Sequence, residues 1–168
     1  AKICGKYNPH SYDIGQGVDL TEWNPSEYDS KAADLEGING PIIGYVGSLL
    51  AMRLDIELLE QLASSHTHWN FVFVGPEDEA FTKSKLHQRT NVFFIGPKRP
   101  EELPAYVHSF DVCINPQLIN EMTVGNYPRK IDEYLAMRKP VVATNTPTMQ
   151  TFLPHVFLAN NLQEYSSL

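Results

Sequence analysis

Short apolar runs alternate with amphipathic stretches from about residue 41 to the end of the chain. Apolar residues recur at helical spacing over 55–65 and 100–109, and more weakly over 77–88. Six apolar runs have the length of strands; they lie at 42–46, 69–74, 91–95, 111–115, 140–144 and 155–159. Strands that are apolar on both faces and alternate with helices are typical of a parallel sheet covered on both sides. The pattern therefore predicts an α/β fold, a Rossmann-like, doubly wound parallel sheet of about six strands.

The first 40 residues lack this periodicity. They hold a Gly-rich piece in which Ile14 and Val18 are candidates for a short strand, followed by polar sequence that contains Trp23. We expect residues 1–40 to form an entry or interdomain segment, and residues 41–168 to form the Rossmann-like domain. The opening residues read like the middle of a chain, so we expect the sequence to be part of a longer protein.

Net charge, cysteine usage and the lengths of apolar runs exclude some classes of function. A net charge of −7 argues against sequence-independent nucleic-acid binding, which needs a basic surface. Cys4 and Cys113 are far apart and show no disulfide or metal-site spacing, which indicates a reducing compartment. No apolar run approaches the about 18 residues that a membrane-spanning helix needs. We therefore expect a cytoplasmic protein.

The stretch 120–136 carries the main candidate chemistry. It follows the strand predicted at 111–115, runs through a polar loop, and is expected to open a helix at Pro128. In a parallel sheet, the carboxyl end of a strand and the following helix N-terminus form a ligand site. Lys130 and Glu133 are three residues apart and so share a helix flank that faces the loop. One cation and one carboxylate there suit a ligand that carries phosphate and a diol, such as a sugar nucleotide.

Two other strand ends carry cations. Gly47 and Ser48 end the first strand, and Arg53 follows; glycine admits a phosphate to the backbone and arginine can bind it with two hydrogen bonds. Pro97 and Lys98 end the third strand and are candidates for lining a base pocket and facing phosphate. A plain tight turn with solvated basic side chains is the alternative at both places. Neither the GxGxxG dinucleotide fingerprint nor the GxxxxGK[ST] P-loop is present.

Together these pieces resemble the C-terminal, nucleotide-sugar-binding half of GT-B glycosyltransferases, specifically glycosyltransferase family 4. The resemblance covers most of the chain from about Tyr12 onward. It rests on segments in the family's order and spacing, at 15–19, 43–48, 71–76, 91–96, 102–106 and 130–144. Gln16 stands where the family usually has Asn, and Ser48 where it usually has Arg. The resemblance implies one half of a GT-B fold.

The resemblance also implies roles for two glutamates. Glu133 would be the second glutamate of the family's Glu-x7-Glu motif and would bind the ribose hydroxyls. Glu121 would be the first, a catalytic candidate near the donor sugar, although eleven residues (122 to 132) separate the pair here instead of seven.

Other donor contacts follow from the same resemblance. The backbone N–H groups of Met122 and Thr123, with the next residue Val124, would face the diphosphate or the sugar, and Arg53 and Lys130 would neutralise the leaving phosphates. Stabilising that charge is the main electrostatic demand of glycosyl transfer. The family is retaining and generally needs no catalytic metal, so we expect no cofactor. The substrate would be a nucleoside-diphosphate sugar, UDP- or GDP-linked.

We therefore expect the donor-binding domain of a retaining glycosyltransferase that transfers a sugar to an acceptor hydroxyl. The acceptor and the active-site His would come from the protein's own N-terminal domain, so this chain alone would bind nucleotide and transfer nothing. Peripheral association of the whole protein with the inner face of a membrane stays open. The alternative is a non-catalytic nucleotide-responsive or protein-interaction module. It would be favoured if Glu133 were held in a structural ion pair and the cleft were plugged.

Overall fold

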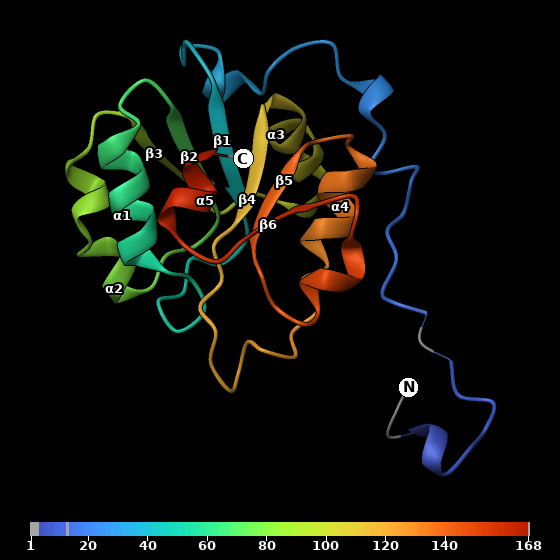
Figure 1. The fold of residues 1–168 in the computed structure, drawn as a ribbon. Coiled ribbons are helices and arrows are strands. Elements are labelled where there is room, and N and C mark those ends of the chain that lie inside the picture. The colour runs from blue at the N-terminus through green and yellow to red at the C-terminus, as the bar shows by residue number, and fades with distance from the viewer. Residues whose placement is uncertain (1–3, 13, 168) are drawn as a thin grey trace.

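The protein forms one parallel sheet with helices on both faces. A computed structural model describes residues 4–12 and 14–167. The sheet has the order β3-β2-β1-β4-β5-β6, and every pairing in it is parallel (Figure 1). Its strands are β1 (Ile42–Val46), β2 (Asn70–Val74), β3 (Val92–Gly96), β4 (Val112–Asn115), β5 (Val141–Thr144) and β6 (Phe157–Ala159). The predicted fold class and all six strands are confirmed, and no strand end differs by more than two residues.

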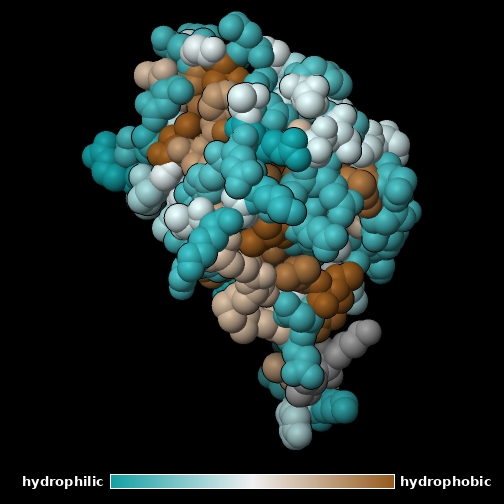
Figure 2. Space-filling model, turned by 90° about the vertical axis from the view of Figure 1, so that its left-hand side faces the viewer, coloured by the Kyte–Doolittle hydropathy of each residue, from teal (hydrophilic) through white to brown (hydrophobic). Residues whose placement is uncertain are grey.

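Two sets of helices cover the two faces of this sheet. The helices are α1 (Ile56–Ser65), α2 (Glu79–Thr82), α3 (Leu103–Ser109), α4 (Lys130–Ala136) and α5 (Leu162–Ser167). One buried cluster joins α3 and α4 to one face, and a second joins α1, α2 and α5 to the other. Close packing of α3 on β1 depends on Gly44, because a Cβ there would lie 2.0 Å from the Phe110 ring. The side of the molecule that includes α1 is mostly hydrophilic, with hydrophobic patches at the upper left and across the lower half of the view (Figure 2).

Local sequence signals explain most helix starts. Asp55 caps α1, since its carboxylate accepts the Leu58 N–H at 2.9 Å. The weak helix expected over 77–88 divides into α2 and a 3-10 turn at Lys85–Gln88. The stretch from Pro100 opens with a 3-10 turn at Pro100–Glu102 and becomes α-helical at Leu103.

The start of α4 differs from the expectation. The helix begins at Lys130, two residues after Pro128. The Pro128 carbonyl accepts the Ile131 N–H at 2.9 Å, so Pro128 belongs to the turn that leads into the helix. The displacement is small, and Lys130 and Glu133 still lie in the first turn of α4.

The entry segment packs against the α3 and α4 face in its second half. Trp23, Leu35 and Ile38 are buried there, and the Ala32 N–H donates to the Ser109 hydroxyl at 2.8 Å. Residues 4–12 lie away from the sheet (Figure 1), whereas Val18 packs against the same buried cluster and the Gln16 side chain donates to the Tyr127 carbonyl at 3.4 Å. The short strand expected around Ile14 and Val18 is wrong: neither residue lies in a strand, because this stretch reaches no edge of the sheet. Further short 3-10 turns lie at Cys4–Lys6, Pro25–Glu27, Ala33–Leu35 and Met149–Phe152.

Candidate functional site

A cavity of about 360 Å³ lies where the carboxyl ends of β1 and β4 meet the start of α4. From β1 the chain proceeds to β2 and β3 on one side, and β4 leads to β5 and β6 on the other. This is the switch point of the sheet, where open α/β folds bind ligands. The polar residues that line this cavity, called the switch-point pocket below, are Tyr45, Ser48, Arg53, Asn115, Gln117, Thr123, Asn126, Tyr127, Arg129, Lys130 and Glu133.

Lys130 lies directly beneath the backbone at the end of β1. Its ammonium donates to the Tyr45 hydroxyl and lies 3.8 Å from the centre of that ring. Gly47 has φ +136, and a Cβ on it would lie 2.7 Å from the Lys130 Nζ. Gly75 packs closely against the Gly47 backbone, since a Cβ on Gly75 would lie 2.1 Å from the Gly47 carbonyl oxygen. Gly47 therefore leaves the space that the Lys130 amine occupies.

The environment of Lys130 disfavours the charged form of its amine. Burial lowers the pKa of Lys130 to about 7, nearby Glu133 opposes that fall, and Arg53 adds to it. Among the described residues, no ion pair involves the Lys130 ammonium. A partly buried amine with a hydroxyl partner and a neighbouring arginine is suited to receive an anion.

Glu133 lines the same pocket one helical turn further on. Burial raises the pKa of Glu133, while Arg129 and Lys130 act in the opposite direction. Its carboxylate pairs with the Arg129 guanidinium, with 3.2 Å between Oε1 and Nε. The Arg129 side chain is 58% exposed, so this partner can leave the carboxylate at little cost. The ion pair that would have favoured a non-catalytic module is present, but the pocket beside it is open.

The start of α4 is held to β1 by Tyr134. Its buried hydroxyl accepts the Val46 N–H at 2.8 Å. The far wall of the pocket is made by Asn115 and Gln117, and the Gln117 side chain donates to the Thr123 carbonyl at 2.6 Å. Sequence reasoning missed these wall residues. Asn115 could have been found, because a polar residue at the carboxyl end of a buried strand lies where ligands bind. The role of Tyr134 could not, because its sequence position is that of an ordinary core residue.

The loop before α4 does not present all the groups expected of it. Thr123 lines the pocket, but Glu121 and Met122 are exposed and are not among the lining residues. The N–H groups of Met122 and Thr123 donate to the Asn120 side-chain oxygen at 3.0 and 3.1 Å. The Val124 N–H donates to the Asn120 carbonyl at 2.9 Å. The expected free N–H donors are therefore occupied within the loop.

Pro97 and Lys98 also lie apart from this pocket. The Lys98 ammonium pairs with the Asp34 carboxylate, which also accepts the Tyr106 hydroxyl at 2.6 Å. That hydrogen-bonded carboxylate raises the pKa of Lys98. The entry segment thus supplies a local anion, and Lys98 faces it instead of a phosphate. Of the predicted donor residues, the structure brings together Gly47, Ser48, Arg53, Thr123, Lys130 and Glu133.

This fold and this pocket define a Rossmann-like domain with a lysine and a glutamate at the switch point of its sheet. The chain belongs to the family of group 1 glycosyl transferases, whose model matches residues 40–161. The predicted resemblance is confirmed.

Individual relatives agree with this assignment. The chain is 30% identical to the putative teichuronic acid biosynthesis glycosyltransferase TuaH of Bacillus subtilis, over 92% of this chain and 39% of that protein. Its structure is similar to Anabaena Alr3699/HepE in complex with UDP and glucose, with a TM-score of 0.70, 20% identity, and 90% and 44% of the two chains covered. It is also similar to the C-terminal domain of a group 1 glycosyl transferase (LpcC) from Francisella tularensis, with a TM-score of 0.65, 17% identity, and 89% and 84% covered.

The chain spans less than half the length of the Bacillus and Anabaena proteins. Within residues 4–12 and 14–167, no helix is long and apolar enough to cross a bilayer. In the same residues, no group of three or more His, Cys, Asp and Glu side chains is placed to hold a metal ion.

Proposed function

We propose that this chain is the donor-binding half of a retaining glycosyltransferase and holds a nucleoside-diphosphate sugar in the switch-point pocket. The observation that carries the proposal is the Lys130 amine beneath Gly47, in one pocket with the Glu133 carboxylate. An amine and a carboxylate in one pocket match a ligand with a diphosphate at one end and a ribose diol at the other. UDP is the favoured nucleotide among the expected UDP and GDP, because the similar Anabaena protein is described in complex with UDP and with UDP-glucose.

Three of the lining side chains then have parts in the reaction. Lys130 and Arg53 neutralise the charge that develops on the departing diphosphate, the step at which electrostatic stabilisation contributes most. When the donor binds, the Glu133 carboxylate releases the Arg129 guanidinium and accepts hydrogen bonds from the ribose hydroxyls. Glu121 and the N–H groups of Met122 and Thr123 reach the donor only when the loop reorganises and releases the bonds to Asn120.

The rest of the activity lies in the whole protein. We infer that the acceptor binds mainly on an N-terminal domain, so that this chain binds nucleotide and transfers nothing alone. The proposed mechanism uses lysine and arginine in place of a metal ion. A cytoplasmic location fits a nucleotide-sugar donor and the free thiols Cys4 and Cys113. Membrane association of the whole protein stays a prediction.

Calorimetric titration of this chain with UDP, GDP and ADP tests the proposal. We expect saturable binding, tightest for UDP. Glu133→Gln should weaken it by about ten- to a hundredfold, because a charge-assisted hydrogen bond is worth about 1.5–3 kcal/mol. The matched control is Glu101→Gln, at an exposed glutamate outside the pocket, which should bind like the parent. Equal binding by the parent and Glu133→Gln would refute the assignment of Glu133.

A further inference from the structure

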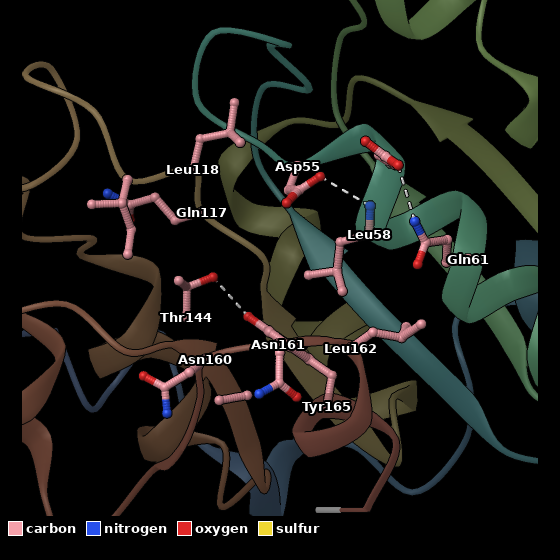
Figure 3. A pocket seen from close by; sticks show the side chains of 13 residues that line it. Asp55, Leu58, Gln61, Gln117, Leu118, Thr144, Asn160, Asn161, Leu162 and Tyr165 are labelled. Carbon is pink, nitrogen blue, oxygen red and sulfur yellow. Dashed lines mark hydrogen bonds between the residues drawn. The ribbon is translucent and has the colours of Figure 1, made fainter.

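A second cavity, of about 290 Å³, opens at the same end of the sheet but on the opposite face. It lies past the carboxyl ends of β4, β5 and β6, between α1 and α5. Figure 3 shows side chains of α1 facing those of residues 160–165 across the cavity, with Gln117 and Leu118 on a third side. None of the roles proposed above uses it. We call it the α1/α5 cavity.

The wall between the two cavities is a rigid piece of backbone. Leu54 and Gln117 form an antiparallel bridge, and the Asp55 N–H donates to the Pro116 carbonyl at 2.9 Å. The Leu118 N–H donates to the Arg53 carbonyl at 2.8 Å, which continues the pairing. Gln117 lines both cavities. The α1/α5 cavity is therefore a neighbour of the switch-point pocket and not an extension of it.

The polar groups of the α1/α5 cavity are held in place by their own bonds. Asn160 and Asn161 line the cavity and are held by Glu164, which does not line it; the Glu164 carboxylate accepts the Asn160 N–H at 2.7 Å and the Asn161 side-chain amide at 3.1 Å. Those bonds lower the pKa of Glu164, so it is ionised at neutral pH. On the opposite side, the Gln61 side-chain NH2 donates to the Glu57 carboxylate at 3.2 Å. Fixed amides can offer donors and acceptors to a ligand at little cost in entropy.

The charge of the lining excludes some ligands. Asp55 and Glu57 are its acidic residues, and no lysine, arginine or histidine is among the described residues that line it. A phosphate or nucleotide would meet like charge here. Amide and carboxylate groups hydrogen-bond hydroxyls well, while Leu58 and Leu162 add partly exposed aliphatic surface. A neutral pyranose has this combination of a hydroxyl rim and an apolar C–H face.

We propose that the α1/α5 cavity is a binding site for a neutral sugar unit, separate from the donor pocket. If the proposed function holds, the sugar belongs to the acceptor saccharide, which would pass over the wall at Gln117. A free monosaccharide has the same chemistry and would occupy the same place.

Amide-resolved NMR titration of the chain with methyl α-glucopyranoside tests this proposal. We expect saturable shifts, with affinity in the millimolar range, at the side-chain amides of Gln61, Gln117 and Asn161. Glucose 6-phosphate should bind more weakly, because its phosphate would face Asp55 and Glu57. An oligosaccharide that binds more tightly than the monosaccharide would identify a saccharide chain as the source, and equal binding would identify a free sugar.

Two variants and one control complete the test. Gln61→Leu should weaken glycoside binding about two- to tenfold, as loss of a neutral hydrogen bond predicts. Leu58→Trp should abolish it by filling the cavity. The control is Gln88→Leu, the same substitution at an exposed glutamine outside the cavity, and it should bind the glycoside like the parent.

Titration of the same samples with UDP separates this proposal from the proposed function. UDP should shift Gly47 and Lys130 in the parent and in Gln61→Leu alike. UDP binding without glycoside binding overturns the saccharide site and keeps the donor site. Glycoside shifts confined to Gly47 and Lys130, tighter binding of glucose 6-phosphate, or no saturable shift at all would each overturn it.

Discussion

The pH dependence of donor binding tests the role assigned to Lys130. With a pKa of about 7 in the empty pocket, about nine in ten of these amines are neutral at pH 8 and about one in ten at pH 6. A diphosphate against the amine favours the charged form and raises that pKa. Donor binding should therefore take up about 0.9 proton at pH 8 and about 0.1 at pH 6. Affinity should fall about tenfold from pH 6 to pH 8.

Calorimetry in buffers of different ionisation enthalpy measures this proton uptake. UDP-glucose is the suitable ligand, because its diphosphate is a diester and has no ionisation near neutral pH. At each pH, the slope of the observed heat against the buffer's ionisation enthalpy gives the number of protons taken up. The same titrations give the affinity, so both quantities come from one set of samples.

Two substitutions at position 130 sharpen the result. Lys130→Arg keeps its charge at every pH used, so proton uptake and pH dependence should disappear while some affinity remains. Lys130→Met should lose most of its affinity at both pH values. The reasoning is refuted if the parent binds tightly with no proton uptake at pH 8 and equal affinity at pH 6 and pH 8.

Three stability predictions follow from the same contacts. The folded state disfavours the charged form of Lys130, so this residue lowers stability fully below pH 7 and less as pH rises toward 10.5. Lys130→Met should therefore be more stable by about 1–3 kcal/mol at pH 6 in urea denaturation, with a smaller gain near pH 10. Gly75→Ala should cost at least about 3 kcal/mol, because its Cβ would meet the Gly47 carbonyl; an unchanged melting temperature would contradict this. Tyr134→Phe should cost about 1–3 kcal/mol in urea denaturation by leaving the buried Val46 N–H unpaired, and a loss below about 0.5 kcal/mol would speak against it.

The sequence by itself determined the order and type of the main elements. Strands of a covered parallel sheet are apolar on both faces, so a run such as Phe71–Val74 is recognisable from composition alone. Capping is equally local, since Asp55 needs only the N–H three residues away. Ligands of parallel sheets bind at the carboxyl ends of the strands, and this rule indicated where a pocket would lie. It placed Gly47 and Lys130 correctly within one pocket.

Only the tertiary structure decided which partner each charged group has. Lys130 meets Tyr45 from 85 positions away, and Lys98 meets Asp34 from 64 positions away. Neither pairing leaves a periodic signal, because it depends on where two distant elements are placed by the packing of the core. The same is true of the α1/α5 cavity, whose walls come from segments around residues 58, 117 and 161. Local patterns specify elements, whereas pairings and cavities arise only when those elements are packed together.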